Sequence, residues 1–304
     1  MSAENESVAG VDLTNPDRVL YPEGGPNKRE LALYLEAVSK RILPFVKRHP
    51  LSLVRCPDGI AKQCFFQKHL TASMPDGFHE VMITENDGDR APYLYIDDVS
   101  GLIGAAQISA LELHVWGASI DDLEHPDRLV FDLDPAEDVG FAEVRAAARD
   151  IRDLLAAAKL PSYPMLTGGK GIHVIVPLSR ANDWPEVKGF AEAIARSLER
   201  QEPDRFIASA AKAKRKGHIF VDWLRNERGA TAIAPYSPRA RKGAAVAMPV
   251  SWEELGKIKA ANAYDTKTAL RRMAGLKADP WKGYTKGARI AKQTLAAALE
   301  ASEE

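Results

Sequence analysis

The sequence predicts a mixed α+β fold in a single domain. Its 304 residues are 45% hydrophobic and 27% charged, which is typical of a folded, water-soluble chain with a sizeable core. Short apolar runs typical of strands alternate with longer segments of helical periodicity. Neither an internal repeat nor a low-complexity linker divides the sequence. We therefore expect one domain over residues 1–304.

The first third of the chain predicts one long helix and several short strands. Asn27 is a suitable N-cap for a helix over residues 28–43, in which Leu31, Leu35, Val38 and Ile42 recur at helical spacing. Pro44 is expected to end or kink this helix. Apolar runs bounded by turn residues predict strands over residues 51–55, 63–67 and 93–96.

Strands and helices then follow one another along the rest of the chain. Helices are predicted over residues 99–108, 141–160, 185–200, 252–257, 266–273 and 288–300. Strands are predicted over residues 111–116, 128–134, 163–166, 172–178, 217–223 and 230–235. We expect the last two strands to pair with each other, with basic residues on their flanks.

The charge of the chain is balanced overall but divided locally. The formal net charge is −1, yet residues 121–153 hold 11 acidic residues against four arginines, and residues 205–242 hold ten basic residues against two acidic ones. The first region suits cations and the second suits polyanions. Solvated helix faces of opposite sign are the alternative explanation.

Nothing in the sequence indicates a membrane or secreted protein. The longest mainly apolar stretch, residues 99–113, is interrupted by polar side chains and is too short to span a bilayer. Residues 1–7 lack the features of a signal peptide. The spacing of Cys56 and Cys64 matches neither a zinc knuckle nor a redox pair. We therefore expect a cytoplasmic protein.

Asp132 and Asp134 are the first residues that indicate chemistry. Residues i and i+2 of a strand face the same side, so both carboxylates project from one face while Phe131 and Leu133 pack on the other. Paired carboxylates repel unless a cation neutralises them, and such pairs hold Mg²⁺ or Mn²⁺ against substrate phosphates. Turn hydrogen bonds at a strand end are the alternative role for an isolated pair.

Asp222 lies in an apolar run, where an unpaired carboxylate is costly to bury. A metal ion is one partner that would neutralise it, and Arg225 or Arg228 is an equally good one.

Between these carboxylates lies the segment Thr167-Gly-Gly-Lys-Gly-Ile-His173, which is not a Walker A loop. Its hydroxyl, glycines, Lys170 and His173 are parts that can grip a triphosphate, while a hairpin with a core histidine is the simpler interpretation. Arg225 and Arg239 can add guanidinium forks for phosphate oxygens. Zinc-protease, hydrolase-elbow, Rossmann and nucleotidyl-lysine ligase motifs are absent from the sequence.

In this order, the motifs around Asp132, Thr167 and Asp222, followed by Ala234-Pro-Tyr-Ser-x-Arg239, resemble the polymerase domain of bacterial ligase D. This family belongs to the archaeo-eukaryotic primase superfamily and acts in non-homologous end joining. The resemblance covers nearly the whole chain. It implies a primase-polymerase core with a central, mostly antiparallel sheet flanked by helices, within residues 51–250. Residues 1–50 would then form an N-terminal segment and residues 251–304 the closing helices.

The resemblance implies a role for each motif residue. Asp132, Asp134 and Asp222 would be catalytic ligands of two Mn²⁺ or Mg²⁺ ions, and His114 a further active-site residue. The triphosphate would be held by Thr167, Lys170, His173, Arg225 and Arg239. Phe65 and Phe66 would stack on bases, although two adjacent strand residues predict that one of them is core.

The family's pocket for the 5′-phosphate of a DNA gap or end matches Asn15, Arg18 and Lys28. Two departures occur: Thr167 stands where serine is common, and Arg18 stands where lysine is common.

The resemblance also implies substrates and partners: ribonucleoside or deoxyribonucleoside triphosphates, DNA with gaps or 3′-overhangs, Ku, and an ATP-dependent DNA ligase in cis or in trans. The rival interpretations are a standalone primase-polymerase of replication or damage tolerance, a metal-dependent nuclease, and a non-catalytic end-binding module. A triphosphate grip argues against a nuclease, and three retained carboxylates argue against a binding module.

Overall fold

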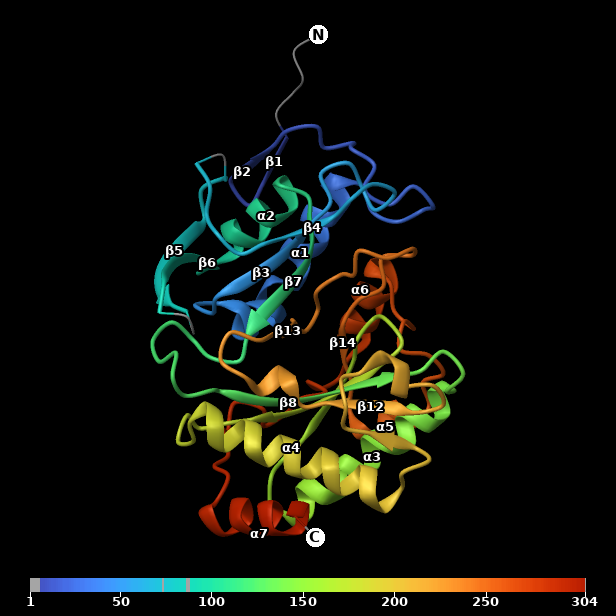
Figure 1. The fold of residues 1–304 in the computed structure, drawn as a ribbon. Coiled ribbons are helices and arrows are strands. Elements are labelled where there is room, and N and C mark those ends of the chain that lie inside the picture. The colour runs from blue at the N-terminus through green and yellow to red at the C-terminus, as the bar shows by residue number, and fades with distance from the viewer. Residues whose placement is uncertain (1–5, 73, 86–87, 304) are drawn as a thin grey trace. The chain divides into compact units, whose positions relative to one another are not determined.

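The computed structural model describes residues 6–72, 74–85 and 88–303 and confirms an α+β fold (Figure 1). The chain forms two compact units. Unit 1 comprises Met1–Asp121, Ile233–Met248 and Tyr264–Leu276, and unit 2 comprises Asp122–Ala232, Pro249–Ala263 and Lys277–Glu304. The chain crosses between the two units several times. The division into units therefore does not test the prediction of a single domain. The boundaries expected at residues 50 and 250 do not coincide with those of the units.

A six-stranded, mostly antiparallel sheet is the centre of unit 2. Its strand order is β11-β12-β8-β10-β9-β14, in which β8 runs antiparallel to β10 and β12, β10 runs antiparallel to β9, and β11 runs parallel to β12. The strands are β8 (Arg128–Pro135), β9 (Tyr163–Leu166), β10 (Ile172–Pro177), β11 (Phe206–Ile207), β12 (Ile219–Asp222) and β14 (Met248–Pro249).

Two amphipathic helices cover one face of this sheet, α3 (Phe141–Ala157) and α4 (Trp184–Gln201) (Figure 1). Both bury residues at helical spacing, and Asp183 caps α4 with a capping box. Phe131 and Leu133 of β8 are fully buried. Because side chains alternate along a strand, Asp132 and Asp134 project from the opposite face. The helix α7 (Lys292–Glu303) packs on α4, and α5 (Trp252–Leu255) is a single turn.

Unit 1 is built on a four-stranded sheet with the order β13-β7-β3-β4. These strands are β3 (Leu51–Arg55), β4 (Phe65–Gln67), β7 (Ala110–Trp116) and β13 (Thr231–Ile233). Two hairpins add β1 (Glu6–Val8) with β2 (Val11–Leu13), and β5 (Phe78–Thr84) with β6 (Arg90–Ile96). The helices are α1 (Lys28–Val46), α2 (Val99–Gln107) and α6 (Thr266–Gly275).

Most predicted elements are present, and three differences have physical causes. Asn27 caps α1 as predicted, but the helix continues to Val46, because Pro44 lies in its last turn, where only one backbone hydrogen bond is lost. The strand β5 was not predicted, since its polar residues obscure the alternation. The strands near residues 217–223 and 230–235 do not pair with each other: β12 joins β8, and β13 joins β7.

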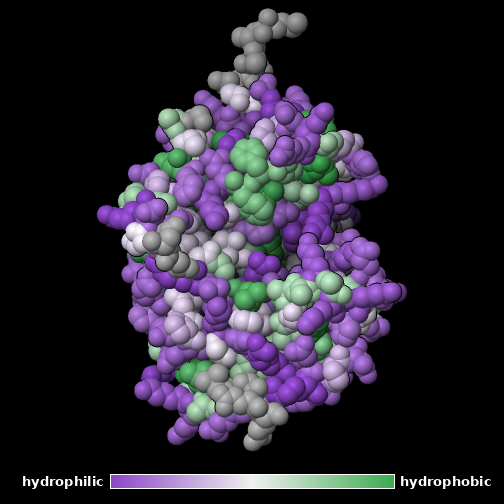
Figure 2. Space-filling view, in the orientation of Figure 1, coloured by the Kyte–Doolittle hydropathy of each residue, from purple (hydrophilic) through white to green (hydrophobic). Residues whose placement is uncertain are grey.

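Cys56 and Cys64 form a disulfide that closes the turn before β4, a pairing that their spacing did not indicate. Among the described residues, no helix is both long and apolar enough to cross a membrane. Hydrophilic residues dominate the face of the molecule shown in Figure 2. Residues 1–5, which contributed to the argument against a signal peptide, lie outside the described residues.

Candidate active site

Strand register brings two aspartates and one histidine together in unit 2. Asp132 in β8 lies directly opposite Asp222 in β12 on one side and opposite His173 in β10 on the other. Asp134 follows on the same face of β8, where it pairs in register with Phe220. Two carboxylates of β8 and a third from the distant strand β12 therefore share one patch of the sheet.

Arg225 neutralises part of this negative charge, and His173 lies beside Asp132. Arg225 places its Nε 3.1 Å from Asp222 Oδ2 and 3.5 Å from Asp132 Oδ2. His173 Nε2 lies 3.3 Å from Asp132 Oδ1. Of the arginines considered for Asp222, Arg225 is thus its partner, while Arg228 pairs with Glu124 at 2.9 Å.

The remaining negative charge shifts the acidity of the aspartates. Burial, followed by the nearby charges of Asp132 and Asp222, raises the pKa of Asp134 to about 6. Burial also raises the pKa of Asp222, although Arg225 opposes the shift. Keeping Asp134 and Asp222 ionised in the folded protein therefore costs free energy. A divalent cation bound between these carboxylates would remove that cost.

The donor set suits a hard divalent cation, because its ligands would all be carboxylate oxygens. Across residues 6–72, 74–85 and 88–303, no group of three or more histidine, cysteine, aspartate or glutamate side chains is already arranged to hold a metal ion. Arg225 instead bridges two of the aspartates. The residues fit a metal by charge and donor type, and their side chains would have to turn toward it.

The glycine-rich segment forms the tight connection from β9 to β10. Thr167 donates its hydroxyl to Gly171 O at 3.0 Å and accepts from Gly169 N at 3.3 Å. Gly168 has φ +69, and a Cβ on Gly171 would overlap the backbone oxygen of Leu133. The glycines thus allow β10 to lie close against β8.

Lys170 projects from this connection with its ammonium 3.4 Å from Glu137, and its side chain is 57% exposed. It remains accessible to a ligand. The hairpin interpretation is correct for the backbone, and the buried His173 is at the same time a partner of Asp132.

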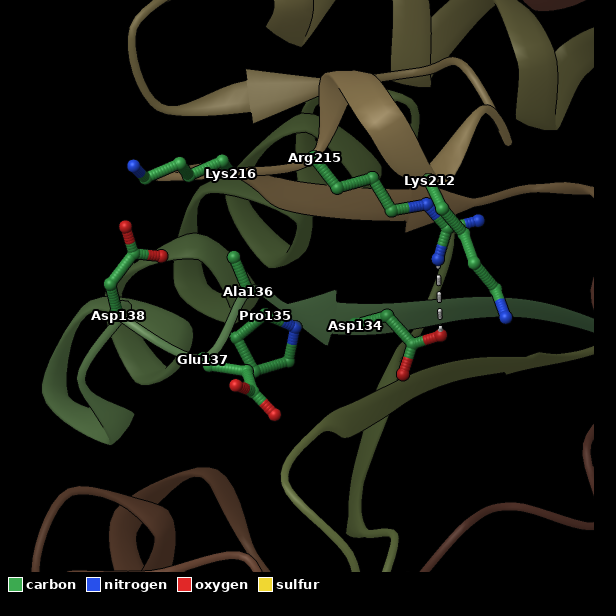
Figure 3. A pocket seen from close by; sticks show the side chains of 8 residues that line it. All are labelled: Asp134, Pro135, Ala136, Glu137, Asp138, Lys212, Arg215 and Lys216. Carbon is green, nitrogen blue, oxygen red and sulfur yellow. Dashed lines mark ion pairs between the residues drawn. The ribbon is translucent and has the colours of Figure 1, made fainter.

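A pocket of about 670 Å³ lies at the end of β8 in unit 2 (Figure 3). Acidic residues on one side face Lys212, Arg215 and Lys216 on the other. Arg215 reaches Asp134, with 3.9 Å between Nη1 and Oδ2, and its guanidinium lies 3.8 Å from the centre of the Phe220 ring. The segment 212–216 therefore contributes to the surroundings of Asp134, which the sequence left open.

A second group of predicted residues lies in unit 1. Nε2 of His114, in β7, lies 2.7 Å from Glu112 Oε2, and Arg239 Nε donates to the same carboxylate at 3.0 Å. The ring of Phe66 meets the His114 ring edge-on, with centroids 5.8 Å apart. Phe65 and Phe66 are 44% and 64% exposed, so the prediction that one of them is core was wrong. Both lie on the short strand β4 at the edge of the four-stranded sheet.

Glu112 was missed by the sequence analysis. Its signal was its position two residues before His114 in an alternating strand, which places both side chains on one face.

The residues predicted to bind a 5′-phosphate are joined by backbone hydrogen bonds in unit 1. Arg18 N donates to Asn15 O, and Lys28 N donates to Arg18 O, both at 3.0 Å. Asn15 adopts φ +52. Lys28 is 4% exposed and donates its ammonium to Thr14 O at 2.9 Å and Gln107 O at 2.8 Å.

Burial, followed by the charge of Arg18, lowers the pKa of Lys28 to about 8. The turn that holds Asn15 and Arg18 is therefore linked to the start of α1, where Lys28 is largely enclosed.

Comparison with known proteins identifies the family. A family model described as "LigD, primase-polymerase domain" matches residues 27–281. The chain belongs to this family. It is therefore a polymerase domain of the LigD type, a nucleotidyltransferase, and the mostly antiparallel core expected from the resemblance is confirmed.

Known LigD proteins are similar over most of this chain. The "Multifunctional non-homologous end joining protein LigD" of Pseudomonas aeruginosa is 39% identical over 283 residues, which are 93% of this chain and 34% of that protein. The protein of the same description from Mycolicibacterium smegmatis is 36% identical over 252 residues, 82% of this chain and 33% of that protein. The chain thus spans about a third of the length of these curated relatives.

The fold of this LigD-type domain is also that of a solved relative. The polymerase domain of Mycobacterium tuberculosis ligase D, in complex with DNA, matches with a TM-score of 0.83 and 31% identity. The match covers 94% of this chain and 100% of that one.

Proposed function

We propose that this polymerase domain adds nucleotides to a primer 3′-hydroxyl at DNA gaps and broken ends during non-homologous end joining. The observation that carries the proposal is the cross-strand pairing of Asp132 with Asp222, with Asp134 on the same face. Family membership and the DNA complex of the M. tuberculosis relative support it. The substrates proposed are ribonucleoside or deoxyribonucleoside triphosphates.

In this proposal the three aspartates hold two Mn²⁺ or Mg²⁺ ions. When bound, such ions supply Lewis acidity toward the 3′-hydroxyl and the triphosphate. Asp132 and Asp222 orient the ligand oxygens, because both are fixed in paired strands. His173 restrains Asp132, and Arg225 balances the charge of the patch. Lys170 and Thr167 bind phosphate oxygens at the β9–β10 turn, and Arg239 adds a guanidinium.

The proposed DNA contacts lie in unit 1. Phe65 and Phe66 stack on bases, because both rings are exposed on an edge strand. Asn15, Arg18 and Lys28 recognise the 5′-phosphate on the far side of a gap. Ku and an ATP-dependent DNA ligase, in cis or in trans, are the proposed partners, and the bacterial nucleoid in the cytoplasm is the proposed location.

The test is extension of a labelled primer on a gapped duplex with Mn²⁺ or Mg²⁺, with and without a downstream 5′-phosphate. The Asp132→Ala/Asp134→Ala variant is expected to lose extension while still binding DNA. Asp153→Ala serves as the control, because this aspartate is 65% exposed on α3 and pairs with its neighbour Arg152.

Aspartate-dependent extension that increases with the 5′-phosphate would support the end-joining polymerase. Extension with no phosphate preference would favour a general primase-polymerase. Primer shortening would favour a nuclease, and binding with no reaction would favour an end-binding module; either result would refute the proposed polymerase activity.

A further inference from the structure

Glu112 is a buried carboxylate on which three hydrogen-bond donors of unit 1 converge. Its side chain is 7% exposed. Oε2 lies 2.7 Å from His114 Nε2, while Oε1 accepts from Arg239 Nε at 3.0 Å and from Ala240 N at 2.8 Å. Two of the three donors thus belong to residues of the proposed active site, His114 and Arg239.

The ionisation state of Glu112 decides which way these hydrogen bonds point. Burial alone would raise the pKa of Glu112, but the hydrogen bond from His114 and the charges of Arg239 and His114 outweigh it and lower the pKa to about 2. An ionised carboxylate only accepts hydrogen bonds. His114 must therefore carry a proton on Nε2, and Nδ1 is an acceptor whenever the ring is neutral.

The same carboxylate holds Arg239 at both its side chain and the following peptide. Its bond to Nε fixes the plane of the guanidinium, and its bond to Ala240 N fixes the backbone beside it. Tyr21 reinforces the segment by donating its hydroxyl to Arg239 O at 2.9 Å. A long arginine side chain is thereby ordered before any ligand arrives, which reduces the entropy lost on binding.

The oriented ring of His114 in turn contacts an aromatic side chain. Its ring meets Phe66 edge-on, although Phe66 is 64% exposed on β4. An imidazole that is free to rotate would not offer a constant edge to that ring.

We propose that Glu112 is a positioning residue of the nucleotide site: it sets the tautomer of His114 and the orientation of Arg239. This inference rests on the proposed function. Glu112 is not itself assigned a contact with the nucleotide, since both its oxygens are occupied by the protein.

The test is Glu112→Gln, which keeps the size of the side chain but replaces one acceptor oxygen by an NH₂ group that cannot accept. The KM for the nucleoside triphosphate is expected to rise by roughly tenfold to 100-fold, with a smaller change in kcat. His114→Ala in the Glu112→Gln background is expected to add much less than it does in the wild type, because both changes remove one unit.

Asp127→Asn is the matched control. Asp127 is a poorly exposed carboxylate that pairs with Arg128 at 2.8 Å in unit 2, so its loss tests the general effect of breaking such a pair. It is expected to leave the nucleotide KM unchanged. Thermal unfolding of each variant shows whether it is folded at the assay temperature.

A spectroscopic measurement separates positioning from mere stabilisation. ¹⁵N correlation spectra of the His114 ring at about pH 8.5, where a free imidazole is neutral, are expected to show a single Nε2–H tautomer in the wild type and a mixture in Glu112→Gln. Asp127→Asn is expected to give the wild-type signal.

The proposal is overturned if Glu112→Gln retains both the wild-type tautomer and the wild-type KM, or if the two substitutions at 112 and 114 are simply additive. If the wild-type chain extends no primer under any metal, the proposed function fails and this inference fails with it. If the wild type is active and Glu112→Gln keeps both the wild-type tautomer and the wild-type KM, only this inference fails.

Discussion

Replacing Asp134 by asparagine is expected to stabilise the folded chain in metal-free buffer while abolishing polymerase activity. Burial and the neighbouring Asp132 and Asp222 raise the pKa of Asp134 from 3.8 to about 6. At neutral pH the folded state therefore holds an ionised carboxylate that it disfavours. An uncharged amide of the same shape removes this repulsion.

The magnitude follows from the shift in pKa. One pKa unit corresponds to about 1.4 kcal/mol, so a rise from 3.8 to about 6 corresponds to about 3 kcal/mol at most. The Asp134 side chain is 48% exposed, and solvent screening reduces the effect. We expect Asp134→Asn to raise the free energy of unfolding by about 1–2 kcal/mol at neutral pH.

The assay is urea unfolding of wild type and variant in EDTA between pH 4 and 8. The folded wild type keeps this proton up to about pH 6, whereas the unfolded chain loses it near pH 3.8. The stability associated with the proton is fully present below the unfolded pKa and is lost as the pH rises through the folded pKa. The advantage of Asp134→Asn is therefore expected to appear between pH 4 and about 6 and then to level off.

Asp153→Asn is the control, because its exposed carboxylate should leave the curves unchanged. Added Mn²⁺ is expected to stabilise the wild type more than Asp134→Asn, since a ligand stabilises the state that binds it. If Asp134→Asn is no more stable than the wild type above pH 7 in EDTA, the reasoning is refuted. The ionised Asp134 carboxylate would then not destabilise the folded state.

Three further predictions concern other parts of the molecule. Phe66→Ala is expected to weaken template DNA binding by about 1–3 kcal/mol in a fluorescence titration and to leave the melting temperature unchanged, because the ring is exposed; a fall in melting temperature would contradict it. Because burial and Arg18 lower the pKa of Lys28 to about 8, the preference for a 5′-phosphorylated gap is expected to fall between about pH 7 and 9. The preference is expected to be absent in Lys28→Met. A pH-independent preference in the wild type would argue against the pocket. Gly171→Ala is expected to cost roughly 1–3 kcal/mol of stability in urea unfolding, since its Cβ would overlap Leu133 O, whereas Gly275→Ala meets no atom within 4 Å and should not destabilise.

Local patterns in the sequence were reliable where neighbouring residues decide the structure. The Asn27 cap, the buried stripe of α1 and the alternation that puts Asp132 and Asp134 on one face of β8 all depend on residues close in the chain. The long helix α1 was misjudged only at its end, where the loss of one hydrogen bond at Pro44 is outweighed by packing of Val46.

Local patterns did not predict which strands pair with each other. The run that ends at Asp222 and the run that ends at Ile233 both look like strands, but nothing local states that they enter different sheets. A strand pairs with whichever strand buries its apolar face best, and that choice depends on residues far along the chain.

The family, the α+β class and the identity of the carboxylates follow from residue types and their order along the chain. Three contacts of the site, by contrast, arise only on folding: Asp222 lies opposite Asp132, Arg225 bridges the two, and Glu112 binds His114 and Arg239. Each of these contacts joins side chains through strand register or the return of a distant loop. Register is set by the packing of whole sheets, so the geometry of the site exists only after the chain has folded.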